Sequence, residues 1–355
     1  MSKLPEWLPQ SGIRYDEAAI RQELEQKKQV PENQVVRVFI IVGIILSSVL
    51  LVSILLVLGI HESPTIMLAL GVFGYISGLL WHRRARTEVF DFWAISLLVM
   101  GYGSITYAFA EWELNTWIAF PIMALLSVVS VLFSFGFILP FLGTLSFYTV
   151  LLTWIAVEKQ PLLMVLFVGL LHLELLVLYL AEGKFLASFR KLSRHFDPIR
   201  LGTVMAIQLA LFIFTPFYIP FVSPEQPFAN YELYYSIPSS VLCFYTVYYL
   251  SPAMGFFKGP SKMAILSIIG ILLILTIYAP AISSTLLLLL LTYYGRHATG
   301  VVLAGLALIY AITMYYYEME FTLLAKSFVL MGTGLIFITG FVLLNRFLKN
   351  HGEER

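Results

Sequence analysis

The sequence predicts an all-α, polytopic integral membrane protein with about twelve transmembrane helices and with both termini in the cytoplasm. Its residues are 59% hydrophobic and only 12% charged, whereas a soluble domain has about 25% charged residues. Apolar runs follow one another along the chain, and each has roughly the 20 residues that a helix needs to cross a hydrocarbon core of about 30 Å. The runs are continuous and do not alternate with polar residues, which excludes a transmembrane β-barrel.

The first apolar run follows a charged tail and is too long for the apolar region of a signal peptide, so we expect it to remain as a membrane anchor. Two places could lower the number of spans. The turn at 135–137 is very tight, and the run 281–295 is short for a full crossing, so a re-entrant or broken pair in either place would leave ten full spans. The expected spans are 37–60, 64–81, 91–110, 116–135, 137–157, 161–181, 201–222, 237–256, 263–279, 281–295, 297–316 and 321–346.

The positions of the basic residues test this order of spans, because translocated loops are poor in Lys and Arg. With the N-terminus inside, 20 of the 22 Lys and Arg residues fall in cytoplasmic segments, and only Lys159 and Lys326 do not. The pattern favours an even number of spans. The predicted parts are a cytoplasmic tail with a short amphipathic helix (1–36), a six-span half (37–181), a basic cytoplasmic loop (182–200), a second six-span half (201–347) and a cytoplasmic tail (348–355).

The composition and the motifs exclude several function classes. A net charge of +1 offers no basic surface for nucleic acid, whose binding depends on neutralising phosphates. The single cysteine, Cys243, can form no internal disulfide, and we interpret it as a small buried residue. No phosphate-binding loop, paired zinc histidines, nucleophile elbow or dinucleotide fingerprint occurs. We therefore predict no catalytic residue, no metal site and no cofactor.

Ionisable and strongly polar residues at membrane depth are costly and are therefore candidate functional residues. His172 and Glu174 lie near the middle of the sixth span, and Glu174 is a candidate proton or ion site. Their two-residue spacing places them about 200° apart around a helix, so they cannot form one cluster by themselves. Gln208 in the seventh span is the third candidate, although such a residue most often forms a hydrogen bond between helices.

A second candidate site lies at the translocated end of the last two spans. Lys326 is close enough to that end for its flexible side chain to reach the interface, where Glu318 and Glu320 lie. These residues could form an ion cluster on the outer face, or they could simply anchor the helices. Elsewhere, Gly71, Gly74 and Gly78 share one face of the second span, a pattern that favours close helix packing.

The segment Tyr315-Tyr316-Tyr317-Glu318-Met319-Glu320-Phe321-Thr322-Leu323-Leu324-Ala325-Lys326-Ser327, which leads into Gly332-x-Gly334, resembles the C-terminal signature of an uncharacterised family of bacterial membrane proteins. That family is a domain of unknown function, often encoded beside a protein named for its GDYXXLXY motif. The resemblance is specific over about 30 residues. It implies a bacterial cytoplasmic (inner) membrane location and a complex with that partner, gives importance to Lys326 and Ser327, and supplies no activity.

Three hypotheses follow. The first is a non-enzymatic subunit of an inner-membrane complex, in contact with the lipid bilayer and holding a small membrane-anchored partner near Lys326 and Glu320. The second is a secondary transporter or lipid flippase with a proton or ion coupling site near Glu174, which the division into six and six spans favours. The third, a membrane-embedded transferase or hydrolase, has the least support, because no nucleophile, metal cluster or paired carboxylate occurs in the sequence.

Overall fold

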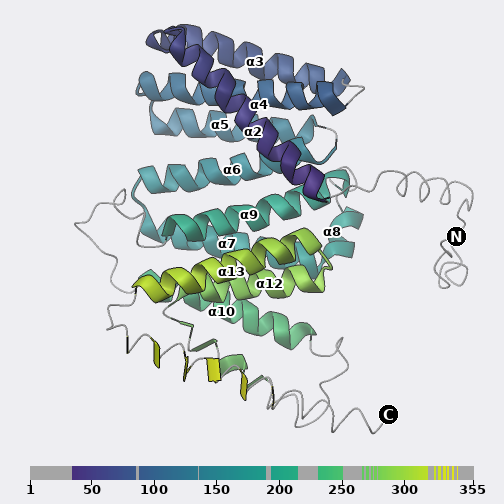
Figure 1. Cartoon of the computed structure of the whole chain (residues 1–355), viewed down its shortest axis with the longest axis vertical. Helices are drawn as coiled ribbons and strands as arrows, with labels where there is room; N and C mark the ends of the chain where they lie inside the picture. The colour runs from purple at the N-terminus through teal and green to yellow at the C-terminus, as the bar shows by residue number, and fades with distance from the viewer. Residues whose placement is uncertain are drawn as a thin grey trace, which may run out of the picture.

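The computed structural model describes residues 34–84, 88–134, 136–188, 193–214, 231–250 and 279–318, together with scattered positions in 266–277 and in 324–342. Within these residues the chain consists of helices and the turns that join them, and they contain no strand. The long helices lie side by side as one extended row, and α2 runs obliquely across the N-terminal end of that row (Figure 1). An all-α fold is therefore confirmed.

Most helices lie where the apolar runs predict them, because each run is long enough for one helix and is bounded by polar or turn residues. The first six are α2 (Gln34–Val57), α3 (Pro64–Arg84), α4 (Glu88–Glu111), α5 (Thr116–Leu132), α6 (Ile138–Val157) and α7 (Pro161–Leu180). The remainder are α8 (Glu182–Ser188), α9 (Phe196–Phe214), α10 (Tyr231–Leu250), α12 (Pro280–Tyr294) and α13 (Ala298–Glu318). The single-turn helices η2 (Ile60–Glu62) and η3 (Ser193–His195) precede α3 and α9.

One boundary differs from the prediction. The expected loop 182–200 contains α8, and α9 begins inside that loop at Phe196, because Pro198 suits the first turn of a helix. Helix α10 is described over Tyr231–Leu250, and the last part of the span predicted at 237–256 lies outside the described residues. The amphipathic helix expected in the N-terminal tail lies outside the described residues.

Five helices of the described part are long and apolar enough to cross a membrane: Pro64–Arg84, Phe90–Glu111, Ile138–Val157, Leu162–Leu180 and Ala298–Tyr317. The apolar helices at Thr116–Leu132 and Pro280–Tyr294 are shorter. At the two places where the number of spans was in question, α5 and α6 flank the tight turn and the short run forms the helix α12. Helices α5 and α6 are joined through Gly136, whose φ of +84° lies in the left-handed region that glycine tolerates.

Helices α3 and α4 approach each other very closely through glycines. A Cβ atom on Gly101 would lie only 2.3 Å from the backbone nitrogen of Tyr75, and one on Gly78 would lie 2.7 Å from the carbonyl oxygen of Ala94. Gly71 and Gly74 also face α4. The packing role predicted for the glycine face of the second span is confirmed, and Gly101 is the matching residue of the neighbouring helix.

A buried core lies between α7, α9 and α12. Leu175, Ile207, Leu287 and Leu288 are completely buried there. This packed core separates two cavities, one on the side of α5 and α6 and one on the side of α13. The position of each cavity determines what its polar residues can bind.

Candidate functional site

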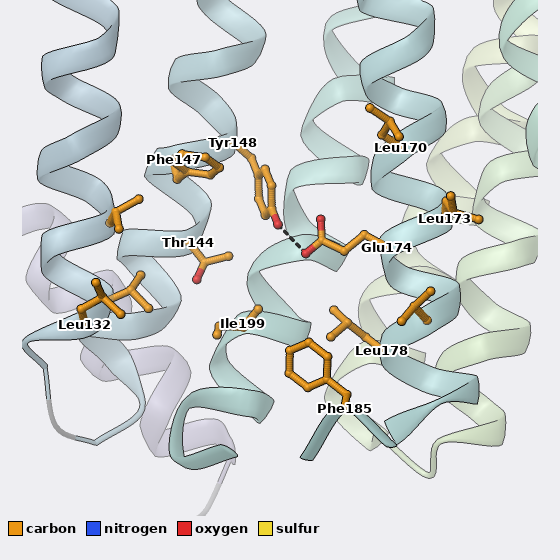
Figure 2. A pocket seen from close by; sticks show the side chains of 13 residues that line it. Leu132, Thr144, Phe147, Tyr148, Leu170, Leu173, Glu174, Leu178, Phe185 and Ile199 are labelled. Carbon is orange, nitrogen blue, oxygen red and sulfur yellow. Dashed lines mark hydrogen bonds between the residues drawn. The ribbon is translucent and has the colours of Figure 1, made fainter. Parts of the chain in front are cut away.

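Glu174 meets a tyrosine from the neighbouring helix. Helix α7 carries Glu174 and α6 carries Tyr148, and the hydroxyl of Tyr148 donates a hydrogen bond of 2.5 Å to Oε1 of Glu174. The two side chains point toward each other across the space between their helices (Figure 2). The hydroxyl of Thr203, on α9, lies near the same carboxyl group and donates its own hydrogen bond, of 3.0 Å, to the carbonyl oxygen of Ile199. Three helices thus contribute to one polar cluster.

This cluster borders a cavity of about 640 Å³, which we call the Glu174 groove. Its volume lies within the range of about 300 to 1,000 Å³ that is usual for sites of small molecules. Apart from Glu174, Tyr148 and Thr144, its lining is apolar. The lining residues are Val128, Val131, Leu132, Thr144, Phe147, Tyr148, Leu170, Leu173, Glu174, Val177, Leu178, Phe185 and Ile199.

The Glu174 groove reaches the outer surface of the helix row. Two of its lining residues, Leu132 and Leu170, are 58% and 61% exposed. Leu170, Leu173 and Val177 lie on one exposed face of α7, and Glu174 follows at the border of that face. Because the exposed rim is apolar, a molecule that enters the groove between α5 and α7 would cross an apolar surface.

His172 points to a different helix, as its spacing from Glu174 predicts. Its Nδ1 lies 2.7 Å from the carbonyl oxygen of Val168, which can only accept, so Nδ1 carries a proton. In a neutral ring Nε2 then accepts a hydrogen bond from the hydroxyl of Ser284 on α12. His172 is fully enclosed, and this geometry makes it a link between α7 and α12.

Sequence reasoning missed the partners of both residues. Tyr148 and Thr203 lie in spans rich in aromatic or hydroxyl residues, and only the packing of α6, α7 and α9 brings them to Glu174. The sequence gives a weak indication of the polar contact at Ser284, because Ser283, Ser284 and Thr285 follow one another inside a short apolar run. The hydroxyl of Ser283 lies 2.8 Å from that of Ser239, so α10 and α12 are also joined by a buried polar contact.

Gln208 lies away from Glu174, at the second cavity. This cavity of about 270 Å³ lies between α9, α12 and α13. Among the residues that the structure describes, Nε2 of Gln208 is buried and has no hydrogen-bond partner. A hydrogen bond between helices, the usual role of such a residue, is therefore not formed by this nitrogen in the described part of the chain.

The family model named Domain of unknown function (DUF4401) matches residues 34–347. The chain belongs to this family. The match confirms the resemblance seen at the C-terminus and extends it over nearly the whole chain. No curated protein and no solved structure matches the chain. Membership in DUF4401 carries no assigned activity.

The other predicted site residues of this DUF4401 chain lie largely outside the described part. This holds for Lys326, Glu320 and the side chain of Glu318, while the backbone at Ser327 is helical. The outer-face cluster and its membrane-anchored partner therefore stay predictions. Within the described residues, no group of three or more His, Cys, Asp or Glu side chains is arranged to hold a metal ion.

A charged cluster lies where α7 ends and α9 begins, beside the turn between α12 and α13. Arg200 donates a hydrogen bond of 2.7 Å to Asp197, and its guanidinium lies 4.8 Å from the centre of the Tyr179 ring. The hydroxyl of Tyr179 lies 3.2 Å from Nδ1 of His297, in the turn between α12 and α13. Burial, and then the nearby positive charge of Arg200, lower the pKa of His297 to about 4.

This shift makes the stability of the protein depend on pH. His297 resists protonation in the folded chain and has a pKa near 6.5 when unfolded. Its contribution to the free energy of unfolding is therefore fully present above pH 6.5. The contribution is lost as the pH falls from about 6.5 to about 4. We expect a slope below about 1.4 kcal/mol per pH unit, since the ring is partly exposed. Unfolding in detergent at several pH values measures the slope.

The matched variant is His297→Asn, which keeps a polar group and removes the titration. The difference in stability between the two proteins should narrow as the pH is lowered through this window. A difference that stays constant between pH 7 and pH 4 would show that His297 titrates normally in the fold.

Proposed function

We propose that the protein is a multi-pass protein of the bacterial inner membrane, with about twelve spans and both termini in the cytoplasm. Five helices of sufficient length and apolar character support a membrane location. The asymmetric distribution of Lys and Arg supports the orientation. The broad apolar exposure of α13, at Val302, Leu306 and Ile309, is what a helix surrounded by lipid would have.

Within this membrane we propose that the protein is a transporter of the secondary or flippase type, which takes an apolar or amphiphilic molecule into the Glu174 groove. One observation carries this proposal: a carboxyl group faces an otherwise apolar cavity that reaches the exposed apolar surface of the helices. Such a cavity can accept a chain from the lipid phase without exposing that chain to water. If Glu174 served only to hold helices together, it would not need an open cavity beside its carboxyl group.

Glu174 is the proposed coupling group. Removing an isolated carboxylate from water costs far more than one hydrogen bond returns, so its charge must be neutralised by a proton or a cation. Tyr148 supplies a hydrogen bond to the carboxyl oxygen and no positive charge. Among the groove-lining residues that the structure describes, no Lys or Arg is present to balance the charge. A proton is the simplest neutralising species, and its gain or loss would change how well the groove holds a polar headgroup.

The proposal keeps the expectation that the protein is not an enzyme. Hydrolysis and group transfer commonly use an activated nucleophile or two cooperating carboxyl groups. The described lining of the Glu174 groove offers one carboxyl group, one phenol and one threonine hydroxyl. This set suits binding and proton exchange better than bond cleavage.

Transfer of a labelled lipid across the membrane of proteoliposomes tests the proposal. A fluorescent phospholipid is placed in both leaflets, and the outer label is bleached by an impermeant reductant, with and without a pH gradient. We expect the wild-type protein to accelerate transfer over protein-free vesicles and the pH gradient to change the rate. Glu174→Gln should remove the dependence on the gradient, because the amide keeps the shape and cannot exchange a proton.

Glu62→Gln is the matched control, since Glu62 is an exposed carboxyl residue in the turn before α3. It should behave as the wild type does. Equal gradient dependence in Glu174→Gln and the wild type would reject Glu174 as the coupling group. Absence of any acceleration by the wild type would reject lipid transfer itself.

A further inference from the structure

The Glu174 groove presents one carboxyl group and two neighbouring aromatic rings to a ligand. Glu174 is partly exposed, and its side chain extends from α7 toward α6 (Figure 2). Phe147 and Tyr148 line the same part of the groove from α6, with their ring centres 5.4 Å apart and their planes at 67° to each other. All three side chains belong to the lining, so one molecule in the groove can contact them together.

The groove has an acidic group and no basic group to balance it. Its described lining contains Glu174 and no Lys, Arg or His side chain. When the carboxyl group loses its proton, its negative charge therefore has no counter-ion in the lining, and an unpaired charge in such surroundings is unfavourable. A ligand with a positive charge would supply the counter-ion, whereas a ligand with a negative charge would be repelled. Charge thus selects among molecules of similar shape.

The other titratable groups around α7 do not supply this counter-ion. Tyr148 donates its hydrogen bond to Glu174 as a neutral phenol. The remaining groups on α7 and on the helices packed against it lie elsewhere: Arg200 with Asp197 at 2.7 Å and Glu182 at 3.6 Å, Tyr179 with His297, His172 with Ser284, Tyr235 against the core cluster of Met164 and Val168, and Lys184 at an exposed position of α8.

The rest of the lining restricts the kind of cation. A metal ion such as Ca²⁺ requires six or more oxygen ligands, and besides Glu174 and Tyr148 the described lining offers the hydroxyl of Thr144, which already donates to the carbonyl oxygen of Pro140 at 2.8 Å. An organic cation needs fewer polar partners, because the faces of aromatic rings attract it. The aliphatic walls and the volume of about 640 Å³ suit a drug-sized apolar body.

We infer that the ligand of the Glu174 groove is a lipophilic organic cation, whose charged centre lies against Glu174 and the rings of Phe147 and Tyr148 while its apolar body fills the rest. This inference names the substrate class of the proposed transporter and rests on that proposal for the transport step. Binding is an exchange of charge. The carboxyl group releases its proton as the cation arrives, and a returning proton neutralises the carboxylate and releases the cation.

Binding of tetraphenylphosphonium to the purified full-length protein tests this inference. Tetraphenylborate is the matched probe, because it has the same four phenyl rings and the opposite charge. Equilibrium dialysis in a nonionic detergent measures both affinities after subtraction of binding to protein-free micelles. We expect the wild type to bind the phosphonium at least about tenfold more tightly than the borate, as a contact with a charged group allows. In weakly buffered solution, about one proton should be released for each cation bound.

Glu174→Gln should lose both the preference for the phosphonium and the proton release, because the amide has the same shape and no charge. Glu62→Gln, at an exposed carboxyl residue in the turn before α3, should keep both. Equal affinity of the wild type for the two ions would overturn the inference without any variant being needed. A preference that persists in Glu174→Gln would overturn it as well.

Dialysis in detergent requires no transport, so its result is independent of the proteoliposome assay. Binding of the phosphonium that depends on Glu174, combined with no lipid transfer, would support this ligand class and reject lipid transfer alone. Lipid transfer combined with no preference for the phosphonium would overturn this inference and leave the proposed transporter standing.

Discussion

Gly101→Ala should lower the free energy of unfolding by about 3 kcal/mol, the upper end of the usual cost of overpacking. The new Cβ atom would lie 2.3 Å from the backbone nitrogen of Tyr75 and 2.6 Å from the carbonyl oxygen of Gly71. Both are backbone atoms, so no side-chain rotation can relieve the contact and α3 must move away from α4. Retention of a monodisperse peak on heating in detergent measures the effect.

Gly103→Ala provides the control on the same helix, because a Cβ atom there would meet nothing within 4 Å. Both substitutions change the helix propensity equally, so their difference isolates the helix contact. Similar thermal stability of the two variants would show that α3 and α4 do not pack as closely as the structure has them.

Val128→Trp should reduce lipid transfer to a tenth of the wild-type rate or less, a loss of at least about 1.4 kcal/mol in the binding or transfer step. Val128 lines the Glu174 groove from α5, opposite α7. An indole at this position would occupy space that the proposed ligand needs. The proteoliposome assay described for Glu174→Gln measures the rate.

Leu125→Trp is the control, because Leu125 lies one turn away on α5 and is exposed outside the groove lining. It adds the same bulk to the same helix and should leave transfer unchanged. Both variants should retain nearly wild-type stability, since neither removes a core residue. Normal transfer by Val128→Trp would mean that the ligand does not use this cavity.

Within the described residues, the sequence predicts the helices well because each apolar run is itself the cause of a helix in lipid. The sequence also predicts the glycine face of α3, since the spacing of Gly71, Gly74 and Gly78 places them together on one side of the helix. The predicted boundary was wrong at the start of α9, where local chemistry prevails over hydropathy. Pro198 lets α9 begin early, inside a segment that its charges marked as a loop.

The candidate site was only half predictable. The cost of an ionisable residue at membrane depth points to Glu174 and His172, and their helical spacing correctly separates them. Their partners depend on which helices become neighbours: Tyr148 comes from α6 and Ser284 from α12, more than 100 residues after His172. Hydropathy carries no information about that pairing. The vacant space beside Gln208 likewise depends on the packing of three helices.

Labelling with dicyclohexylcarbodiimide tests the central claim most directly, because this apolar reagent enters from the lipid phase and modifies protonated carboxyl groups. The account predicts that the protein in lipid vesicles at neutral pH is modified at Glu174, with exposed carboxyl residues such as Glu62 unmodified, and that Val128→Trp slows the reaction. Peptide mass spectrometry would identify the site. If Glu174 stays unmodified while the reagent labels other carboxyl groups, Glu174 is either not protonated or not reachable through the groove, and the proposed coupling site would be contradicted.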